Sequence, residues 1–208
     1  MLRAVFFGTP EFAVPSFERL AQAAEVLLVV TQPDRPAGRS SEPQPSPVAR
    51  AAAARGIEVE KPGRLKSNEA LRERLAAARP DVLVVVAYGR LLPDWVLEMP
   101  PLGAVNVHAS LLPRHRGASP VQSAVLAGDE ETGVSTMRIV QELDAGPVYL
   151  AEKTRIGERE DAGALSRRLS LLGADLLIRT LSGLEAGTLE ARPQQGEPSW
   201  SPVIRRED

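Results

Sequence analysis

The segment Asp81–Gly89, with the sequence DVLVVVAYG, constrains the fold of this 208-residue chain more than any other. Its centre is an unbroken series of aliphatic, mostly β-branched side chains, without the polar alternation of a strand that has one face in water. Such a run indicates a strand that is buried on both faces, as in parallel sheets covered by helices on each side. We therefore predict an α/β fold.

The segments around this strand alternate between strand-like and helix-like patterns. Strands are expected at 2–7, 25–30, 57–61 and 103–109, and helices at 10–22, 48–56, 66–78, 118–127 and 161–186. Two further strands, 132–140 and 146–156, are expected to pair in an antiparallel manner around Asp144. This order predicts a doubly wound, mostly parallel twisted sheet of the Rossmann-like kind with an antiparallel edge hairpin. Ligands of such sheets bind at the carboxyl ends of the strands.

The composition excludes several classes of function. The absence of Cys excludes thiol chemistry and disulfides, and with only two His we expect no metal site. No apolar run approaches the roughly 20 residues that span a bilayer, and the first segment is typical of a strand rather than of a signal peptide. We therefore expect a cytoplasmic protein without a membrane association. The net charge of −2 counts mildly against a nucleic-acid binder.

The segment Gly8-Thr9-Pro10-Glu11 follows the first expected strand, where a dinucleotide-binding loop would lie. Pro10 and Ala13 stand where that loop needs glycines, and Glu11 would repel a phosphate, so this function is excluded. We predict instead the start of a helix, with Thr9 as the N-cap and Pro10 in the first turn. The alternative is a loop edge that also contacts a substrate.

Two polar residues share one face of the strand at 103–109. Alternation places Asn106 and His108 on the face opposite to Val105 and Val107, at the end where ligands of this fold bind. A hydrogen-bonded core histidine beside an asparagine is one interpretation; a pair that faces a ligand is the other. The arginines of the following segment 114–117 suit either a solvated loop or an anion site.

Asp144 lies in the turn between the two antiparallel strands. It is either a turn aspartate that supports a glycine-containing loop or a carboxylate that orients the imidazole of His108. Together, Asn106, His108 and Asp144 suit acyl transfer to an amine, with an oxyanion donor, a proton carrier and a positioning carboxylate. A serine hydrolase is disfavoured because the G-x-S-x-G elbow is absent and Ser110 lies only two residues from His108.

Several segments resemble methionyl-tRNA formyltransferases and occur in the order of that family. They read FFGTPEFAVP, VTQPDRPAGR, PSPV, VVVAYGRLLP, LGAVNVHASLLPRHRGASPVQSAVLAGDEETGVS and ELDAGPVY, and they extend over nearly the whole chain. The Asn-x-His-x-Ser-Leu-Leu-Pro motif is shared by all formyltransferases that use 10-formyltetrahydrofolate. The segments GTPEFAVP and TQPDRPAGR are more specific and indicate the tRNA enzyme.

The resemblance implies roles for individual residues. Asn106, His108 and Asp144 would be catalytic, and Arg39 would face the tRNA acceptor end. The folate site would be lined by Ser110, Leu111, Leu112 and Pro113 and bordered by Tyr88, Gly89, Arg90, Leu91, Leu92 and the turn 142–146. In many family members the loop after Arg39 carries lysines and apolar residues, whereas here it reads Ser-Ser-Glu-Pro-Gln (40–44), in which Glu42 would repel phosphate if it pointed inward.

The function implied is transfer of the formyl group of 10-formyltetrahydrofolate to initiator methionyl-tRNA, a step of translation initiation. The partner would be that tRNA, and we expect the enzyme to be a monomer. An alternative acceptor is a small amine such as glycinamide ribonucleotide or an amino-sugar nucleotide, and a third hypothesis is a folate-binding domain without catalysis. Residues 1–189 would form the catalytic domain. Residues 190–208 would form a linker toward a C-terminal tRNA-binding domain that is absent from this chain.

Overall fold

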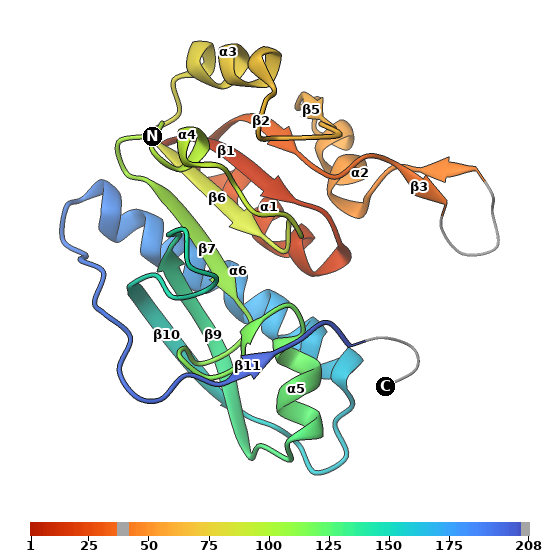
Figure 1. Ribbon diagram of the computed structural model, residues 1–208, viewed down its shortest axis with the longest axis vertical. Helices are drawn as coiled ribbons and strands as arrows, with labels where there is room; N and C mark the ends of the chain where they lie inside the picture. Colours follow the sequence, from red (N-terminus) through yellow and green to blue (C-terminus); the bar gives the residue numbers. More distant parts are fainter. Residues whose placement is uncertain (37–41, 205–208) are drawn as a thin grey trace. The chain divides into compact units, whose positions relative to one another are not determined.

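The computed structural model describes residues 1–36 and 42–204 of the chain. The chain divides into two compact units, Met1–Val105 and Asn106–Asp208, and each is described by itself. The first contains β1 (Arg3–Gly8), β2 (Glu25–Val30), β5 (Val59–Glu60) and β6 (Val82–Val86), and the second contains β9 (Glu131–Arg138) and β10 (Val148–Arg155); β7 (Ala104–His108) spans the boundary. The sheet order is β10-β9-β7-β6-β1-β2-β5 (Figure 1).

In the first unit, β1, β2, β5 and β6 run parallel to one another. β1 lies between β2 and β6, with Phe6 opposite Val29 on one side and opposite Val84 on the other. All five residues of β6 are buried, as its uninterrupted aliphatic sequence predicts. Because β9 and β10 pair antiparallel at the other end of the strand order, the predicted α/β fold with a mostly parallel sheet and an antiparallel edge hairpin is confirmed.

Short polar caps begin two of the helices of the first unit. Ser46 accepts a hydrogen bond from the Ala49 amide at 3.1 Å and begins α2 (Pro47–Ala54). Asn68 accepts one from the Leu71 amide at 3.0 Å and begins α3 (Glu69–Ala78). The remaining elements of this unit are η1 (Glu11–Ala13), α1 (Val14–Ala23), the hairpin of β3 (Arg35–Pro36) with β4 (Pro43–Gln44), and α4 (Asp94–Leu97).

The predicted N-cap role of Thr9 is wrong. The 3₁₀ turn η1 begins after Pro10 without a side-chain cap, and α1 follows with Pro15 in its first turn. The Thr9 hydroxyl instead donates to the carbonyl oxygen of Tyr88 at 3.3 Å. Thr9 therefore connects the end of β1 to the segment that follows β6, a contact between distant segments that helix-start patterns do not contain.

The second unit combines the β9–β10 hairpin with two helices (Figure 1). The long helix α6 (Ala162–Glu185), capped by Asp161, packs against β9 and β10, and α5 (Pro120–Leu126) packs against α6. Gly173 makes the close approach of α6 possible, because a Cβ there would lie 2.8 Å from a methyl group of Val107. The helix therefore packs on the apolar face of β7, and Asn106 and His108 lie on the opposite face of that strand.

The described part of the segment 190–208 is hydrogen-bonded to other segments of the second unit. Arg192 forms an antiparallel bridge with Val148, and β11 (Trp200–Ser201) pairs in parallel with β8 (Arg116–Gly117). The assignment of 190–208 as a linker to a further domain stays a prediction. Within the residues described, no helix combines the length and apolarity needed to cross a bilayer.

Candidate functional site

The carboxyl end of β7 carries Asn106 and His108, both within the second unit. The Asn106 side chain is half-buried, and its amide has no hydrogen-bond partner among the described residues. His108 is 6% exposed and is therefore a buried imidazole. Since buried polar groups normally find partners, the unpaired amide of Asn106 has its donors and acceptor available to a ligand.

One nitrogen of the His108 ring is bound to the backbone. His108 Nε2 lies 2.9 Å from the carbonyl oxygen of His115, and because a carbonyl can only accept, Nε2 donates. The hydrogen on Nε2 leaves Nδ1 as the ring nitrogen that can take up or release a proton. The imidazole therefore has one structural nitrogen and one that is available for chemistry.

Asp144 lies on that second side of the ring. Its Oδ2 is 3.7 Å from His108 Nδ1, and the same oxygen accepts a hydrogen bond from the Gly117 amide at 2.8 Å. The distance to Nδ1 exceeds that of a direct hydrogen bond but lies within ion-pair range. Asp144 has a positive φ of 50°, a conformation that costs a non-glycine residue energy and is concentrated at functional sites.

The segment Ser110–Pro113 is anchored to β9 by one side chain. The Ser135 hydroxyl donates to the Ser110 carbonyl oxygen at 2.7 Å and accepts from the Leu112 amide at 3.2 Å. The Ser110 hydroxyl donates to the carbonyl oxygen of Arg114 at 2.5 Å, so it supports the loop. Pro113 is buried, whereas Leu111 and Leu112 remain partly exposed and can contact a ligand.

The loop that holds His108 is itself anchored by a carboxylate. His115 Nε2 lies 2.7 Å from Asp129 Oδ2, and Arg114 donates to the other carboxylate oxygen at 2.6 Å. His115 also has a positive φ of 54°. Since the His115 carbonyl accepts from His108, these contacts fix the orientation of the candidate catalytic ring.

The segment near the C-terminus contributes two serines to the same loop. The Ser199 hydroxyl accepts from the His115 amide at 2.9 Å, and the Ser201 hydroxyl lies 3.1 Å from the carbonyl oxygens of both His115 and Arg116. Sequence reasoning missed Ser135, Ser199 and Ser201, because an isolated serine in a polar segment carries no signal of what it contacts. The candidate site therefore extends to residue 201.

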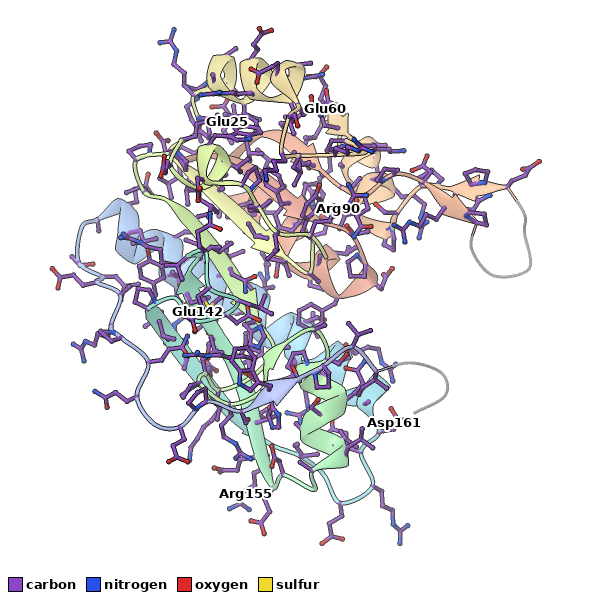
Figure 2. The ribbon with its side chains drawn as sticks, viewed as in Figure 1. Glu25, Glu60, Arg90, Glu142, Arg155 and Asp161 are labelled. Carbon is purple, nitrogen blue, oxygen red and sulfur yellow. The ribbon has the colours of Figure 1, made fainter. Side chains whose placement is uncertain are left out.

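The residues predicted to border the folate from the segment after β6 belong to the first unit. Tyr88 is buried with its ring edge-on to Phe7, and burial raises the pKa of its phenol, which the charge of Arg90 partly offsets. Arg90, labelled in Figure 2, donates to the carbonyl oxygens of Pro62 and Gly63 at 3.0 and 2.8 Å.

Residues 89–92 differ in their exposure. Gly89 has a φ of +78°, Leu91 is 75% exposed and Leu92 is 8% exposed. Arg90 and Leu91 line a cavity of about 360 Å³ together with residues 63–67 of the same unit. Arg39, predicted to face tRNA, lies outside the described residues.

A close backbone approach fixes the turn that carries Asp144. A Cβ on Gly146 would overlap the carbonyl oxygen of Arg138. We predict that Gly146→Ala lowers the free energy of unfolding by about 1–3 kcal/mol, as overpacking does, and lowers catalytic activity because Asp144 moves with the turn. Urea denaturation and a turnover assay measure the two effects.

The matched control for this variant is Gly157→Ala. A Cβ on Gly157 has its nearest neighbour at 3.5 Å, an ordinary van der Waals contact, and the φ of this residue is not positive. Its stability and activity should match the wild type. A Gly146→Ala variant as stable and active as Gly157→Ala would show that the turn moves without consequence.

A protein-bound metal ion usually needs several ligand side chains around one position, which can be sought in the part of the chain that the structure describes. No group of three or more His, Cys, Asp or Glu side chains converges there on a metal-sized position. The carboxylate nearest to His108 is bound to a backbone amide, and His115 is bound to Asp129. These side chains can donate and accept hydrogen bonds, and an imidazole can carry a proton.

The sequence matches known proteins over most of its length. A family model described as formyl transferase matches residues 2–181. A methionyl-tRNA formyltransferase of Thermus thermophilus is 49% identical over 207 residues, covering 100% of this chain and 67% of its own. The chain thus spans about two thirds of the length of the curated relatives it matches.

Solved structures share the fold. Glycinamide ribonucleotide transformylase 1 from Symbiobacterium toebii has a TM-score of 0.77 at 20% identity, covering 93% of each chain. An N-formyltransferase from Helicobacter canadensis, solved with folinic acid and dTDP-3-aminofucose, has a TM-score of 0.74 at 18% identity, covering 100% of this chain and 72% of that one. Sequence and fold agree, and the chain belongs to the formyl transferase family and, within it, to the methionyl-tRNA formyltransferases.

Proposed function

We propose that this chain transfers the formyl group of 10-formyltetrahydrofolate to the α-amino group of initiator methionyl-tRNA. The observation that carries the proposal is the end of β7, where an amide without a hydrogen-bond partner among the described residues lies on one face with an imidazole, and a carboxylate is 3.7 Å from that imidazole. The similarity of the whole chain to methionyl-tRNA formyltransferases supports this acceptor.

Asn106 would stabilise the negative charge that develops on the formyl oxygen. The amine nitrogen attacks the formyl carbon, a new C–N bond forms, and the electron pair of the C=O bond moves to oxygen. The Asn106 amide N–H has no competing acceptor among the described side chains, so it can donate to that oxygen. The C–N bond to the folate then breaks, and tetrahydrofolate leaves.

His108 would carry the proton that the amine loses. Nδ1 is the available nitrogen, since Nε2 is bound to the His115 carbonyl oxygen, and the Asp144 carboxylate stabilises the imidazolium that forms. The proton passes to the departing folate nitrogen, which balances the reaction. An α-amino group titrates near pH ~8, so a fraction is neutral at physiological pH and no strong base is needed.

The co-substrate and partner assignments belong to the same proposal. Leu111, Leu112 and the adjacent Ser110 and Pro113 would contact folate, and the loop around Arg39 would contact tRNA. The folinic acid of the Helicobacter canadensis relative supports a folate co-substrate, and the family similarity supports the assignment of residues 88–92 to its border. Because initiator tRNA is used where translation starts, the proposed activity places the chain in the cytoplasm. We propose that it acts there as a monomer. Size-exclusion chromatography of the purified chain tests this oligomeric state.

An acceptor screen tests the proposal. Purified chain is incubated with 10-formyltetrahydrofolate labelled in the formyl carbon and, separately, with methionyl-tRNA, glycinamide ribonucleotide and an amino-sugar nucleotide. We expect the label to appear on methionyl-tRNA. In the control reaction with deacylated tRNA, which lacks the α-amino group, no label should appear. Label on a small amine alone would replace the proposed acceptor, an outcome that the fold shared with the glycinamide ribonucleotide enzyme makes worth measuring.

A further inference from the structure

Gln194 connects two loops that approach the candidate site from different parts of the second unit. Its Nε2 lies 2.8 Å from the carbonyl oxygens of both Asp144 and Gly146 and donates to them. Its Oε1 accepts from Nε and Nη2 of Arg116, at 3.1 and 2.8 Å. One amide side chain therefore makes four hydrogen bonds, two to the turn at 144–146 and two to the loop before Gly117.

We propose that Gln194 is a positioning residue that holds the Asp144 carboxylate beside His108. The Gly117 amide binds Asp144 Oδ2, and Gly117 directly follows Arg116, which Gln194 holds. Gln194 also binds the Asp144 carbonyl, so it is bonded both to the residue that carries the acceptor and to the neighbour of the residue that carries the donor in the contact between Gly117 and Asp144. This assignment rests on the proposed function, in which Asp144 stabilises the protonated imidazole.

The conformation of the turn explains why it needs such a residue. Asp144 has a φ of +50°, which a non-glycine residue keeps only when its surroundings hold it there. Glu142, labelled in Figure 2, precedes it in the same turn and is largely exposed, 3.7 Å from Arg116 Nη1. Exposed ion pairs contribute little, so the half-buried Gln194 is the stronger restraint.

Only an amide side chain fits this position. The two carbonyl oxygens require N–H donors, whereas the Arg116 guanidinium requires an acceptor. A glutamate at position 194 would keep the contact with Arg116 but would point a carboxylate oxygen at two carbonyl oxygens. A methionine would keep the volume and lose all four hydrogen bonds, so Gln194→Met and Gln194→Glu separate the two halves of the contact.

The first test measures the position of the Asp144 carboxylate without using activity. Amide hydrogen exchange is followed by NMR in the full chain for wild type, Gln194→Met, Gln194→Glu and Asp144→Ala. We expect the Gly117 amide to exchange on the order of tenfold faster in both Gln194 variants, as for lost hydrogen bonds, and in Asp144→Ala. Gln195→Met, at an exposed neighbouring glutamine, is the matched control and should exchange as wild type does.

Amides of β6 in the first unit report whether a variant unfolds globally, and they should keep wild-type protection. A Gly117 amide that exchanges at the wild-type rate in Gln194→Met would overturn the proposal. Wild-type exchange in Gln194→Glu with fast exchange in Gln194→Met would also overturn it, because the contact with Arg116 alone would then hold the turn.

The second test asks whether positioning affects turnover. In Gln194→Met we expect kcat for formyl transfer to fall about tenfold with the KM for 10-formyltetrahydrofolate little changed, because Gln194 acts through Asp144. In the Asp144→Ala background the same substitution should add little further loss, since coupled residues are non-additive. Full additivity would show that Gln194 acts elsewhere. A wild-type chain that formylates no acceptor would refute the proposed function, whereas the exchange experiment would still decide the positioning role.

Discussion

Replacing His108 by alanine is expected to lower the turnover of formyl transfer by about a hundredfold or more, the range for loss of a general acid–base group. The structure gives the physical reason. His108 Nδ1 is the ring nitrogen left for proton transfer, and no other imidazole replaces it, since His115 Nε2 is bound to Asp129. Steady-state kinetics with methionyl-tRNA measure the loss, and fluorescence titration should find the affinity for folate little changed.

His108→Gln separates the proton transfer from the structural contact. A glutamine amide can still donate to the His115 carbonyl, so the loop stays anchored, but it cannot take up a proton near neutral pH. We expect the thermal unfolding midpoint to be closer to wild type than in His108→Ala, with an equal loss of turnover. A His108→Gln variant with near-normal turnover would remove proton transfer by this residue from the mechanism.

Replacing Asn106 by alanine is expected to lower kcat by roughly a hundredfold to a thousandfold, as for removal of one oxyanion donor. Unlike most polar residues in a core strand, Asn106 has a side-chain amide without a hydrogen-bond partner among the described residues. Its loss should therefore leave the free energy of unfolding unchanged or slightly higher. Turnover assays and urea denaturation of the same preparation test both parts.

Asn106→Asp is the matched variant, because it keeps the size of the side chain and replaces donors with a negative charge. That charge would face the developing oxyanion, so the expected loss of turnover is at least as large as in Asn106→Ala. If Asn106→Ala retained most of its activity while Asn106→Asp lost it, the residue would line the site without stabilising the oxyanion.

The fold was predictable where side-chain patterns are local and repeated. The aliphatic run of β6 and the apolar face of α6 each indicate their element, and their observed bounds differ from the expected ones by only a few residues. Thr9 shows the limit: its sequence context is that of a helix cap, but its hydroxyl binds the carbonyl oxygen of Tyr88, 79 positions away. Two-residue strands such as β8 and β11 have no periodicity to detect.

The candidate site was predictable in part for a similar reason. Alternation along one strand placed Asn106 and His108 on a common face, and the family resemblance selected Asp144, which lies 3.7 Å from the His108 ring. Nothing in the pattern indicates that Gln194 rather than Gln195 reaches the turn, because both are glutamines in a polar segment. Such contacts arise from tertiary structure and join residues that are far apart in the chain, so no local sequence pattern indicates them.

The pairing of β11 with β8 has a consequence for biosynthesis. Ser199 and Ser201 bind the loop that holds His108, yet they are made more than eighty residues after it. Domains fold during translation as their segments emerge from the ribosome, so a nascent chain that ends before Gln194 exposes a strand edge at β8 and an unsupported turn at Asp144. The loop that holds His108 is thus fully anchored only after residues 194–201 have left the exit tunnel.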